Sequence, residues 1–414
     1  MKRLCLFTAL LIAPLLHADW ASWRGPRGNG IAPESAQPVL TWNESENILW
    51  KSEIPGRGHA SPTVVGDRIY LSTSEVEQDD NGSQSVIALD ANSGRIVWQN
   101  ELFSGELPAR IHQKNTHASP TVGASDAGLF VTYYREGSVY LHCLDRSDGK
   151  PRWGIRCGPF ASKYPFGYAP SPCLWNDLVL VSAESAPDGF LKAYRQSDGE
   201  RVWSAPRGDG TSYSSPVIGT LGGREQILLS GHLRVDSYDP SSGSKLWTAP
   251  GPANATCGTL VWSEEAGIVF ASGGYPQKAT FAVNPTGEIV WQNKEKSYEQ
   301  SMLYHDGHLY SFTDAGFALC WDAKTGEEKW KERLKGPVSA SPILAGGRIY
   351  ALNERGTTFV IAPNPDRFEI LATNQLGEEG FATPSFVGKR IYHRTAEEID
   401  GRRVEFLYAI EAAR

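Results

Sequence analysis

Two short segments of the chain place a histidine at the same distance ahead of a Ser-Pro pair. The sequence RGHASP begins at Arg57, and NTHASP begins at Asn115. Histidine titrates near neutral pH, so His59 and His117 are candidates for proton transfer or metal binding. The Arg and Asn two residues earlier supply hydrogen-bond donors suited to an anionic or sugar-like ligand.

The Ser-Pro pair recurs along the chain, so both segments belong to an internal repeat. The pair or its substitute occurs at Ser61-Pro62, Ser119-Pro120, Ser171-Pro172, Ser215-Pro216, Gly258-Thr259, Ser301-Met302, Ser341-Pro342 and Thr383-Pro384. Each pair precedes two runs of alternating apolar residues joined by a short turn, which predicts a β-hairpin. The first residue of each pair is small, as crowding around the axis of a propeller requires.

Aligning the repeats on this pair predicts a shared site. The positions two and four residues before it carry varied polar and aromatic side chains, which lie on the same face if the strand extends that far. We expect them to form rings near one mouth of a central channel and to bind a ligand there. The candidate residues are Arg57, His59, Asn115, His117, Tyr168, Tyr213 and Glu299.

Two other interpretations of these residues stay open. They can be solvated or blade-linking side chains without a ligand. His59 and His117 can also share a metal ion with a third ligand, although a lone histidine pair is more often hydrogen-bonded than metallated. We therefore assign no metal site, and the sequence shows no set of catalytic residues such as Gly-x-Ser-x-Gly or His-Glu-x-x-His.

A second repeat defines the outer strands. The segment ALDANSGRIVW, Ala88–Trp98, has near copies ending at Trp153, Trp203, Trp247 and Trp330, and a shorter one ending at Trp291. Consecutive tryptophans, counted from Trp50, are 39 to 55 residues apart, the length of one four-stranded propeller blade. The Asp-x-x-Ser/Thr-Gly part predicts a tight turn, and we expect the tryptophans to pack between blades.

The repeats predict an all-β protein, an eight-bladed β-propeller of four-stranded antiparallel blades. The last blade has no outer strand of its own before the chain ends. We expect residues 47–54 to pair with Val404–Ala412 and to close the ring, which removes an open sheet edge. The predicted organisation is a signal peptide over residues 1–18, an N-terminal arm over 19–46 and the propeller over 47–414.

The beginning of the chain predicts export. Lys2 and Arg3 precede an apolar run from Leu4 to Leu16, which is short for a membrane span and typical of a cleaved secretory signal; an uncleaved anchor is the alternative. We expect a periplasmic or extracellular protein without a transmembrane or lipid anchor. The net charge of −7 disfavours nucleic acid as a partner. Five cysteines follow the signal, and their pairing stays open.

The turn-Gly-Trp repeat resembles that of the pyrroloquinoline-quinone-type propellers, the quinoprotein-like superfamily. That superfamily includes quinoprotein alcohol dehydrogenases and a bacterial outer-membrane assembly lipoprotein. The segments WASWRGPRGNGIA (20–32), IPGRGHASPTVVGDRIYL (54–71), IHQKNTHASPTV (111–122) and FGYAPSPCL (166–174) also resemble a group of exported propeller proteins of planctomycete-type bacteria. The resemblance covers the whole chain after the signal and implies the fold more strongly than an activity.

For function, the resemblance leaves three hypotheses. The favoured one is a non-catalytic binding or scaffold protein, a monomer that binds protein segments or glycans and needs no cofactor. The second is an oxidoreductase using pyrroloquinoline quinone with calcium; such enzymes often carry a disulfide between adjacent cysteines, and this sequence has no adjacent pair. The third is a carbohydrate-active enzyme in which histidine or tyrosine acts as acid or base.

Overall fold

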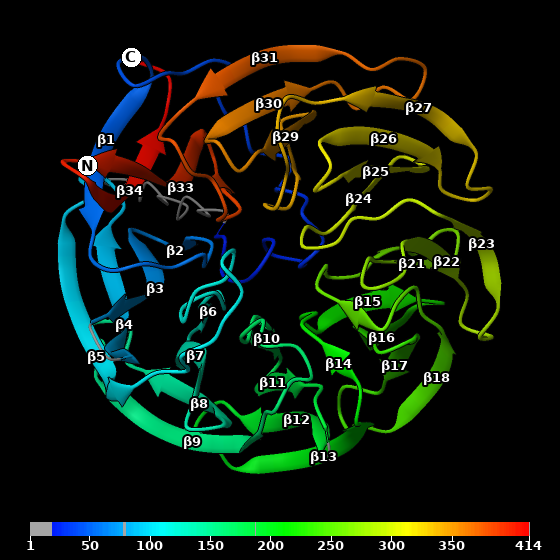
Figure 1. The fold of residues 1–414 in the computed structure, drawn as a ribbon, viewed down its shortest axis with the longest axis horizontal. Helices are drawn as coiled ribbons and strands as arrows, with labels where there is room; N and C mark the ends of the chain where they lie inside the picture. The colour runs from blue at the N-terminus through cyan, green and yellow to red at the C-terminus, as the bar shows by residue number, and fades with distance from the viewer. Residues whose placement is uncertain (1–18, 78–79, 187, 414) are drawn as a thin grey trace, which may run out of the picture.

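The computed structural model describes residues 19–77, 80–186 and 188–413. Within these ranges the strands form eight four-stranded antiparallel sheets that are arranged as blades around a central axis (Figure 1). No α-helix occurs among the described residues. The prediction of an all-β, eight-bladed propeller is therefore confirmed.

The blades are numbered here in chain order, each from its innermost strand outward. Blades 1 to 4 consist of β2 (Thr63–Val65), β3 (Arg68–Val76), β4 (Asn81–Asp90), β5 (Ile96–Glu106); β6 (Gly123–Ser125), β7 (Gly128–Arg135), β8 (Ser138–Leu144), β9 (Pro151–Pro159); β10 (Cys173–Trp175), β11 (Leu178–Ala183), β12 (Gly189–Arg195), β13 (Arg201–Gly208); and β15 (Val217–Leu221), β16 (Arg224–Gly231), β17 (Arg234–Tyr238), β18 (Lys245–Pro250). Blades 5 to 8 consist of β20 (Val261–Ser263), β21 (Ile268–Gly273), β22 (Ala279–Val283), β23 (Ile289–Asn293); β24 (Leu303–His305), β25 (His308–Phe312), β26 (Phe317–Asp322), β27 (Glu328–Arg333); β28 (Ile343–Ala345), β29 (Arg348–Leu352), β30 (Thr357–Ile361), β31 (Ile370–Gln375); and β32 (Ser385–Val387), β33 (Arg390–Ile399), β34 (Arg402–Ile410), β1 (Ile48–Ile54). A short parallel pair, β14 (Thr211–Ser212) with β19 (Ala255–Thr256), links two inter-blade loops.

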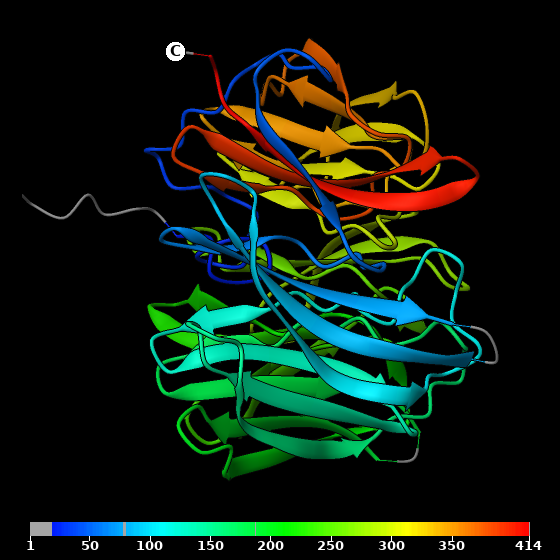
Figure 2. The ribbon, with the colours of Figure 1, turned by 90° about the vertical axis from the view of Figure 1, so that its left-hand side faces the viewer.

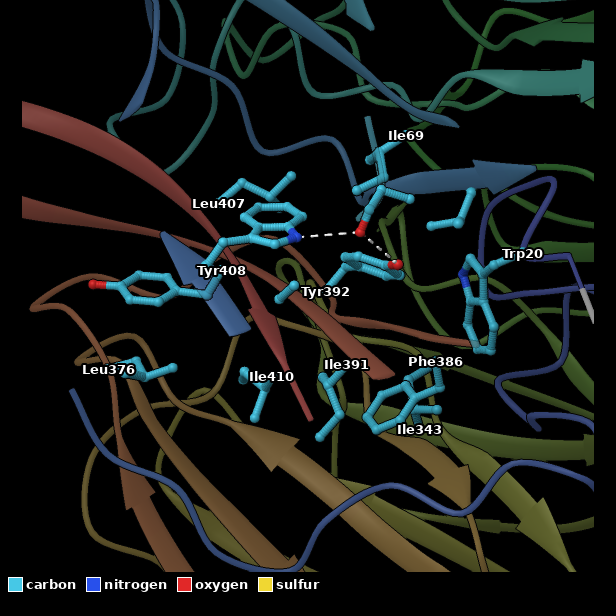
Figure 3. Packing of buried hydrophobic residues seen from close by; sticks show 14 of the residues in the cluster. Trp20, Ile69, Ile343, Leu376, Phe386, Ile391, Tyr392, Leu407, Tyr408 and Ile410 are labelled. Carbon is cyan, nitrogen blue, oxygen red and sulfur yellow. Dashed lines mark hydrogen bonds between the residues drawn. The ribbon is translucent and has the colours of Figure 1, made fainter. Parts of the chain in front are cut away.

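Blade 8 joins the two ends of the chain, as predicted. Strand β1 pairs antiparallel with β34, with Ile48 opposite Ile410 and Ile54 opposite Glu405. Figure 3 shows the core around this junction, where Leu407, Tyr392 and Ile69 from blades 8 and 1 lie together. The hydroxyl of Tyr392 donates to the carbonyl of Ala91 at 3.4 Å, so blade 8 is tied to the turn of blade 1.

The repeated tryptophan and glycine belong to one inter-blade contact. The Trp153 indole lies over Gly199, the turn glycine of the next blade, and its Nε1 donates to the Gln196 carbonyl at 3.1 Å. The same hydrogen bond to the next blade's turn is made by Trp50 to Ala91, Trp203 to Pro240, Trp291 to Ala323 and Trp330 to Asn364. The expectation that these tryptophans pack between blades is confirmed for this set. Trp98 and Trp247 lack this bond, since Trp98 Nε1 has no partner among the described residues and Trp247 Nε1 donates to Gln226 of its own blade.

The hydroxyls of the innermost segments form a second inter-blade contact. The backbone N–H of one blade donates to a Ser or Thr hydroxyl of the next: Ser61 to Thr121, Thr121 to Ser171, Ser171 to Ser215, Thr259 to Ser301, Ser301 to Ser341 and Ser341 to Thr383. Small side chains are therefore required around the axis for hydrogen bonding as well as for space. In blade 5 the residue of this series is Thr259, and its hydroxyl accepts from the Trp23 indole of the arm at 2.9 Å.

The arm ahead of β1 crosses the ring on one side (Figures 1 and 2). Trp20 pairs with Val64 and is fully buried. Arg24 is also buried, and its Nη2 donates to the carbonyl of Met302 at 2.6 Å. Its Nε and Nη1 have no partner among the described residues, and burial lowers the pKa of Arg24 to about 9. The arm therefore closes one end of the central channel.

The expected signal peptide, residues 1–18, lies outside the described residues. Within the described part of the chain, no helix has the length and apolar character needed to span a membrane. Cys143, Cys157, Cys173, Cys257 and Cys320 are all free thiols.

Candidate functional site

The central channel contains a chamber of about 190 Å³ next to the arm. Trp23 of the arm forms part of its wall, and the Trp23 indole donates from Nε1 to Thr259 at 2.9 Å. The other lining residues come from inter-blade loops: His59, His112, Lys114, Asn115, Ser119, Phe166, Ala169, Ser171, Tyr213, Ser215, Cys257, Thr259, Tyr298, Glu299, Ser339 and Phe381.

Four of the seven residues predicted from the sequence line this chamber. His59, Tyr213 and Glu299 all occupy the position two before the repeat marker, and Asn115 lies four before it. The Tyr213 hydroxyl lies 2.6 Å from that of Ser162 and donates to the Tyr164 carbonyl at 3.1 Å. These bonds fix the phenol ring as a rigid part of the wall.

The other three predicted residues do not line the chamber. The Tyr168 ring packs in the core between blades 2 and 3, and its hydroxyl donates to the Ser182 carbonyl at 2.9 Å. Arg57 pairs through its backbone with Ser74, and its guanidinium reaches the Gln113 carbonyl at 3.4 Å. His117 is half-buried, and burial lowers its pKa. In blade 2 the inter-blade hydrogen bonds are made by Thr121 and not by Ser119. The position two before it is therefore Ser119, which lines the chamber, and His117 lies four before it.

Sequence reasoning missed several lining residues. Lys114, Phe166 and Tyr298 lie at positions three or five before a marker. A strict alternation of side chains excludes them, yet these residues belong to loops, where alternation does not hold. Phe381 and Ser339 could have been predicted from the sequence, because both lie two residues before the marker in the alignment of the repeats.

A charged cluster crosses the chamber. Lys114, between blades 1 and 2, places Nζ 2.7 Å from Glu354 Oε1 of blade 7 and 3.6 Å from Glu299 Oε2. The Ser339 hydroxyl lies 2.5 Å from Glu299 and 2.6 Å from Glu354. Burial alone would lower the pKa of Lys114, but the hydrogen bond to Glu354 and the charge of Glu299 raise it. The ammonium is thus fixed between opposite sides of the ring.

Two buried polar atoms of the chamber residues have no nitrogen or oxygen atom as a hydrogen-bond partner within the described chain. One is Nε2 of His59, whose ring stacks on Phe381 with 4.7 Å between centroids. Burial, followed by the charge of Arg57, lowers the pKa of His59 well below its usual range, so the imidazole is neutral. The other is the hydroxyl of Tyr298, which lies against the thiol of Cys257, a weak hydrogen-bond partner. Buried polar groups are normally satisfied, so both atoms are available to a ligand or to water.

An aromatic cluster surrounds the mouth of the chamber. Tyr164 and Phe166, on the loop between β9 and β10, stack at 5.3 Å, and Tyr164 meets Tyr275 edge-on at 5.0 Å. Phe166 also contacts His112 and Tyr213, so the cluster reaches into the chamber wall. Tyr275 is 43% exposed.

The family model for the outer membrane protein assembly factor BamB matches residues 33–118, 82–279 and 277–365. The chain belongs to this family. The matched segments run through the blades that build the chamber. The relation to the quinone-type propellers and to the outer-membrane assembly propeller, which the repeat implied, is therefore confirmed.

Curated relatives fall into two groups. The BamB protein of Burkholderia pseudomallei is 24% identical over 88% of this BamB-family chain and 99% of its own length. A quinoprotein ethanol dehydrogenase of Pseudomonas putida is 21% identical over 80% of the chain and 52% of its own length. A tetrathionate hydrolase of Acidithiobacillus ferrooxidans is 20% identical over 74% of the chain and 51% of its own length. The chain therefore spans about half the length of these two enzymes.

Solved structures show the same fold. BamB from Moraxella catarrhalis superposes with a TM-score of 0.61 at 17% identity, covering 87% of this chain and 96% of that one. A europium-containing methanol dehydrogenase superposes with a TM-score of 0.68 at 14% identity, covering 95% of this chain and 98% of that one. The fold is thus shared by an assembly factor and an enzyme, so the fold alone does not decide the function.

The chamber of this BamB-family chain does not fit pyrroloquinoline quinone with calcium. The quinone carries three carboxylates, whereas Lys114 is the one lysine on the described wall and already binds Glu354. Calcium takes six to eight oxygen ligands, several of them carboxylates. Glu299 is the single carboxylate on that wall, and the described residues contain no group of three or more His, Cys, Asp or Glu side chains that could hold a metal ion.

Proposed function

We propose that this chain is an exported, non-catalytic scaffold propeller, periplasmic or extracellular, that binds a protein segment at the mouth of its chamber. The observation that carries the proposal is the pair of buried atoms, His59 Nε2 and the Tyr298 hydroxyl, which have no nitrogen or oxygen partner within the described chain. A neutral imidazole nitrogen and a phenol offer an acceptor and a donor. A peptide unit or a side-chain amide offers the complementary pair of groups.

The aromatic cluster at the mouth of the chamber supports a protein as the ligand. Aromatic side chains are enriched in protein interfaces, where they act as rigid anchors. Tyr164, Phe166 and Tyr275 form such a cluster at the opening. The match to BamB over nearly the whole relative supports the same role.

The ionisable groups of the chamber support a role without catalysis. Lys114 is paired with both Glu354 and Glu299, and the Ser339 hydroxyl is engaged by the same two carboxylates. Burial raises the pKa of the Cys257 thiol far above neutral, so it is not a nucleophilic thiolate. The proposal requires no cofactor.

Site-specific photocrosslinking tests this function. A benzoylphenylalanine in place of Tyr275 is expected to crosslink to a protein in the cells that make the chain. The same probe in place of Val202, an exposed residue on outer strand β13, is the control and is expected to give no such product. Phe166→Ala should reduce the Tyr275 crosslink at least several-fold.

Enzyme assays test the alternative function, a quinone-dependent dehydrogenase. Dye reduction with alcohols or aldoses, after addition of pyrroloquinoline quinone and calcium, is expected to stay at background. Turnover that depends on the quinone, together with no protein crosslink from the rim, would refute the scaffold function.

A further inference from the structure

A second cavity lies on the opposite face of the propeller, between the arm and blades 3 to 6. This groove has a volume of about 560 Å³. Its aromatic residues are Trp23, Trp175, Trp262 and Tyr304. Trp23 also belongs to the chamber wall, so this indole separates the groove from the chamber.

The aromatic rings of the groove are held in place by neighbouring groups. Trp175 donates from Nε1 to Glu225 Oε2 at 2.9 Å, which fixes the plane of its indole. Trp262 lies against Gly219 of the adjacent blade, where a Cβ atom would come within 3.0 Å of the indole carbons. Both indoles are only partly covered. Their rings are preorganised, so a ligand does not have to order them on binding.

Tyr304 adds a third fixed ring. It stacks on Phe270 with 5.9 Å between centroids, and its hydroxyl accepts from Ser263 at 2.9 Å. The Trp175 and Trp262 indoles and this phenol come from the innermost strands β10, β20 and β24 of blades 3, 5 and 6, and the Trp262 ring covers Gly219 of blade 4 between them. They therefore form a curved row of ring faces beside the arm.

Polar groups line the edges of this row. Glu225 and Glu264 are exposed carboxylates, Arg27 is an exposed guanidinium, and Asn29 and Asn176 supply amides. Flat apolar faces with acceptors and donors at their edges complement a pyranose ring, which has C–H faces and a hydroxyl perimeter. We propose that this groove binds a pyranose oligosaccharide, with two or more sugar rings packed on the aromatic row.

Two other ligand classes fit the groove less well. A proline-rich peptide binds aromatic grooves through indole N–H donors to its carbonyls, but the N–H groups of Trp23 and Trp175 are already bound to Thr259 and Glu225. A nucleic acid would meet the carboxylates of Glu225 and Glu264 on a chain with a net charge of −7.

Titration calorimetry on the full mature chain tests the inference, with the tetramers of β-1,4-linked N-acetylglucosamine, β-1,4-linked glucose and α-1,4-linked glucose as probes. At least one is expected to bind saturably below about 10 mM, since a weak sugar site has a roughly millimolar Kd. The absence of binding by all three, or Trp262-dependent binding of a proline-rich peptide instead, would overturn the proposal.

Variants locate the site. Trp175→Ala and Trp262→Ala should each weaken binding at least about tenfold, because each removes a ring face from the row. Trp175→Phe keeps an aromatic ring, and Glu264→Gln changes an exposed side chain that the fold does not need. Each should weaken oligosaccharide binding less than the two alanine variants do. The matched control is Tyr275→Ala, an exposed aromatic at the chamber mouth, with unchanged affinity expected.

Unchanged affinity in both tryptophan variants would show that the sugar binds elsewhere, and it would refute the proposal that the groove is the oligosaccharide site. This inference is independent of the scaffold function, because Phe166→Ala should reduce the protein crosslink and leave oligosaccharide binding unaltered. Failure of one proposal is therefore distinguishable from failure of the other.

Discussion

The indole of Trp98 lies directly on the backbone of Gly149, the turn glycine of the next blade. A Cβ atom at Gly149 would come within 2.5 Å of two indole carbons, and the residue has φ of +72°. Both the left-handed backbone and the close contact require glycine. One residue in each turn thus couples the local conformation of a hairpin to the packing of the preceding blade.

The first prediction follows from this contact. Gly149→Ala should destabilise the protein by about 2–4 kcal/mol, since it adds a steric clash to the strain of the positive φ. Gly137→Ala is the matched control in the same blade, with φ of +68° and nothing within 4 Å of the added Cβ. It should cost only about 1 kcal/mol. Urea unfolding of both variants measures the difference, and equal losses would contradict a role for the indole contact.

The second prediction concerns the hydroxyl contacts around the axis. The buried Ser341 hydroxyl accepts from the Ser301 N–H at 2.9 Å. Ser341→Ala leaves that N–H unsatisfied and should cost about 1–3 kcal/mol. Ser61 is the control, because its buried hydroxyl has no partner among the described residues. Ser61→Ala should be neutral or slightly stabilising in the same unfolding measurement.

The sequence was sufficient for the fold because each blade repeats the same local requirements. The Gly and Trp of segments such as Ala88–Trp98 determine a turn and an inter-blade contact without reference to the rest of the chain. The closing strand was also predictable, because blade 8 lacked one strand and Asn47–Ile54 had no blade of its own. Repetition therefore allowed topology to be inferred from a single chain.

The chamber was less predictable, because its residues follow loop geometry. The position two before the marker faces the axis at His59 and Glu299, but in blade 2 the equivalent residue is Ser119, because the inter-blade bond is made by Thr121. Four residues before the marker, Arg57 pairs with Ser74 and its guanidinium turns toward Gln113. Lys114 reaches Glu354 across 240 residues of sequence, a contact that no local pattern encodes.

The third prediction is a loss of stability in mild acid. Burial lowers the pKa of both His142 and His393 to about 4, and His142 Nε2 lies 3.3 Å from a nitrogen of Arg135. Unfolded histidine titrates near 6.5, so below that pH the unfolded chain binds more protons than the folded one. Stability should be complete above about pH 6.5 and fall toward pH 4, by up to about 3 kcal/mol for each histidine.

Calorimetric melting between pH 7.5 and 4.5 measures this loss. Low-pKa carboxylates such as Asp239, with a pKa of about 2, lose their contribution only below about pH 4, outside this window. His142→Gln should reduce the pH dependence of Tm, because its amide oxygen can accept from Arg135 without titrating. A Tm that does not vary across the window would contradict the assignment of buried, neutral histidines.

The fourth prediction tests the joining of the chain ends. Removal of residues 19–54 deletes β1 and leaves β34 with an unpaired edge, since the described β34 pairs only with β33 and β1. Exposed edges pair with other strands, so the shortened chain should associate through β34. A chain that begins at Asn47 lacks the arm but keeps β1, and it is the matched control. Light scattering after gel filtration should show dimers or larger species for the first chain and monomers for the second. Association of both chains to the same extent would show that the arm, not the closing strand, prevents it.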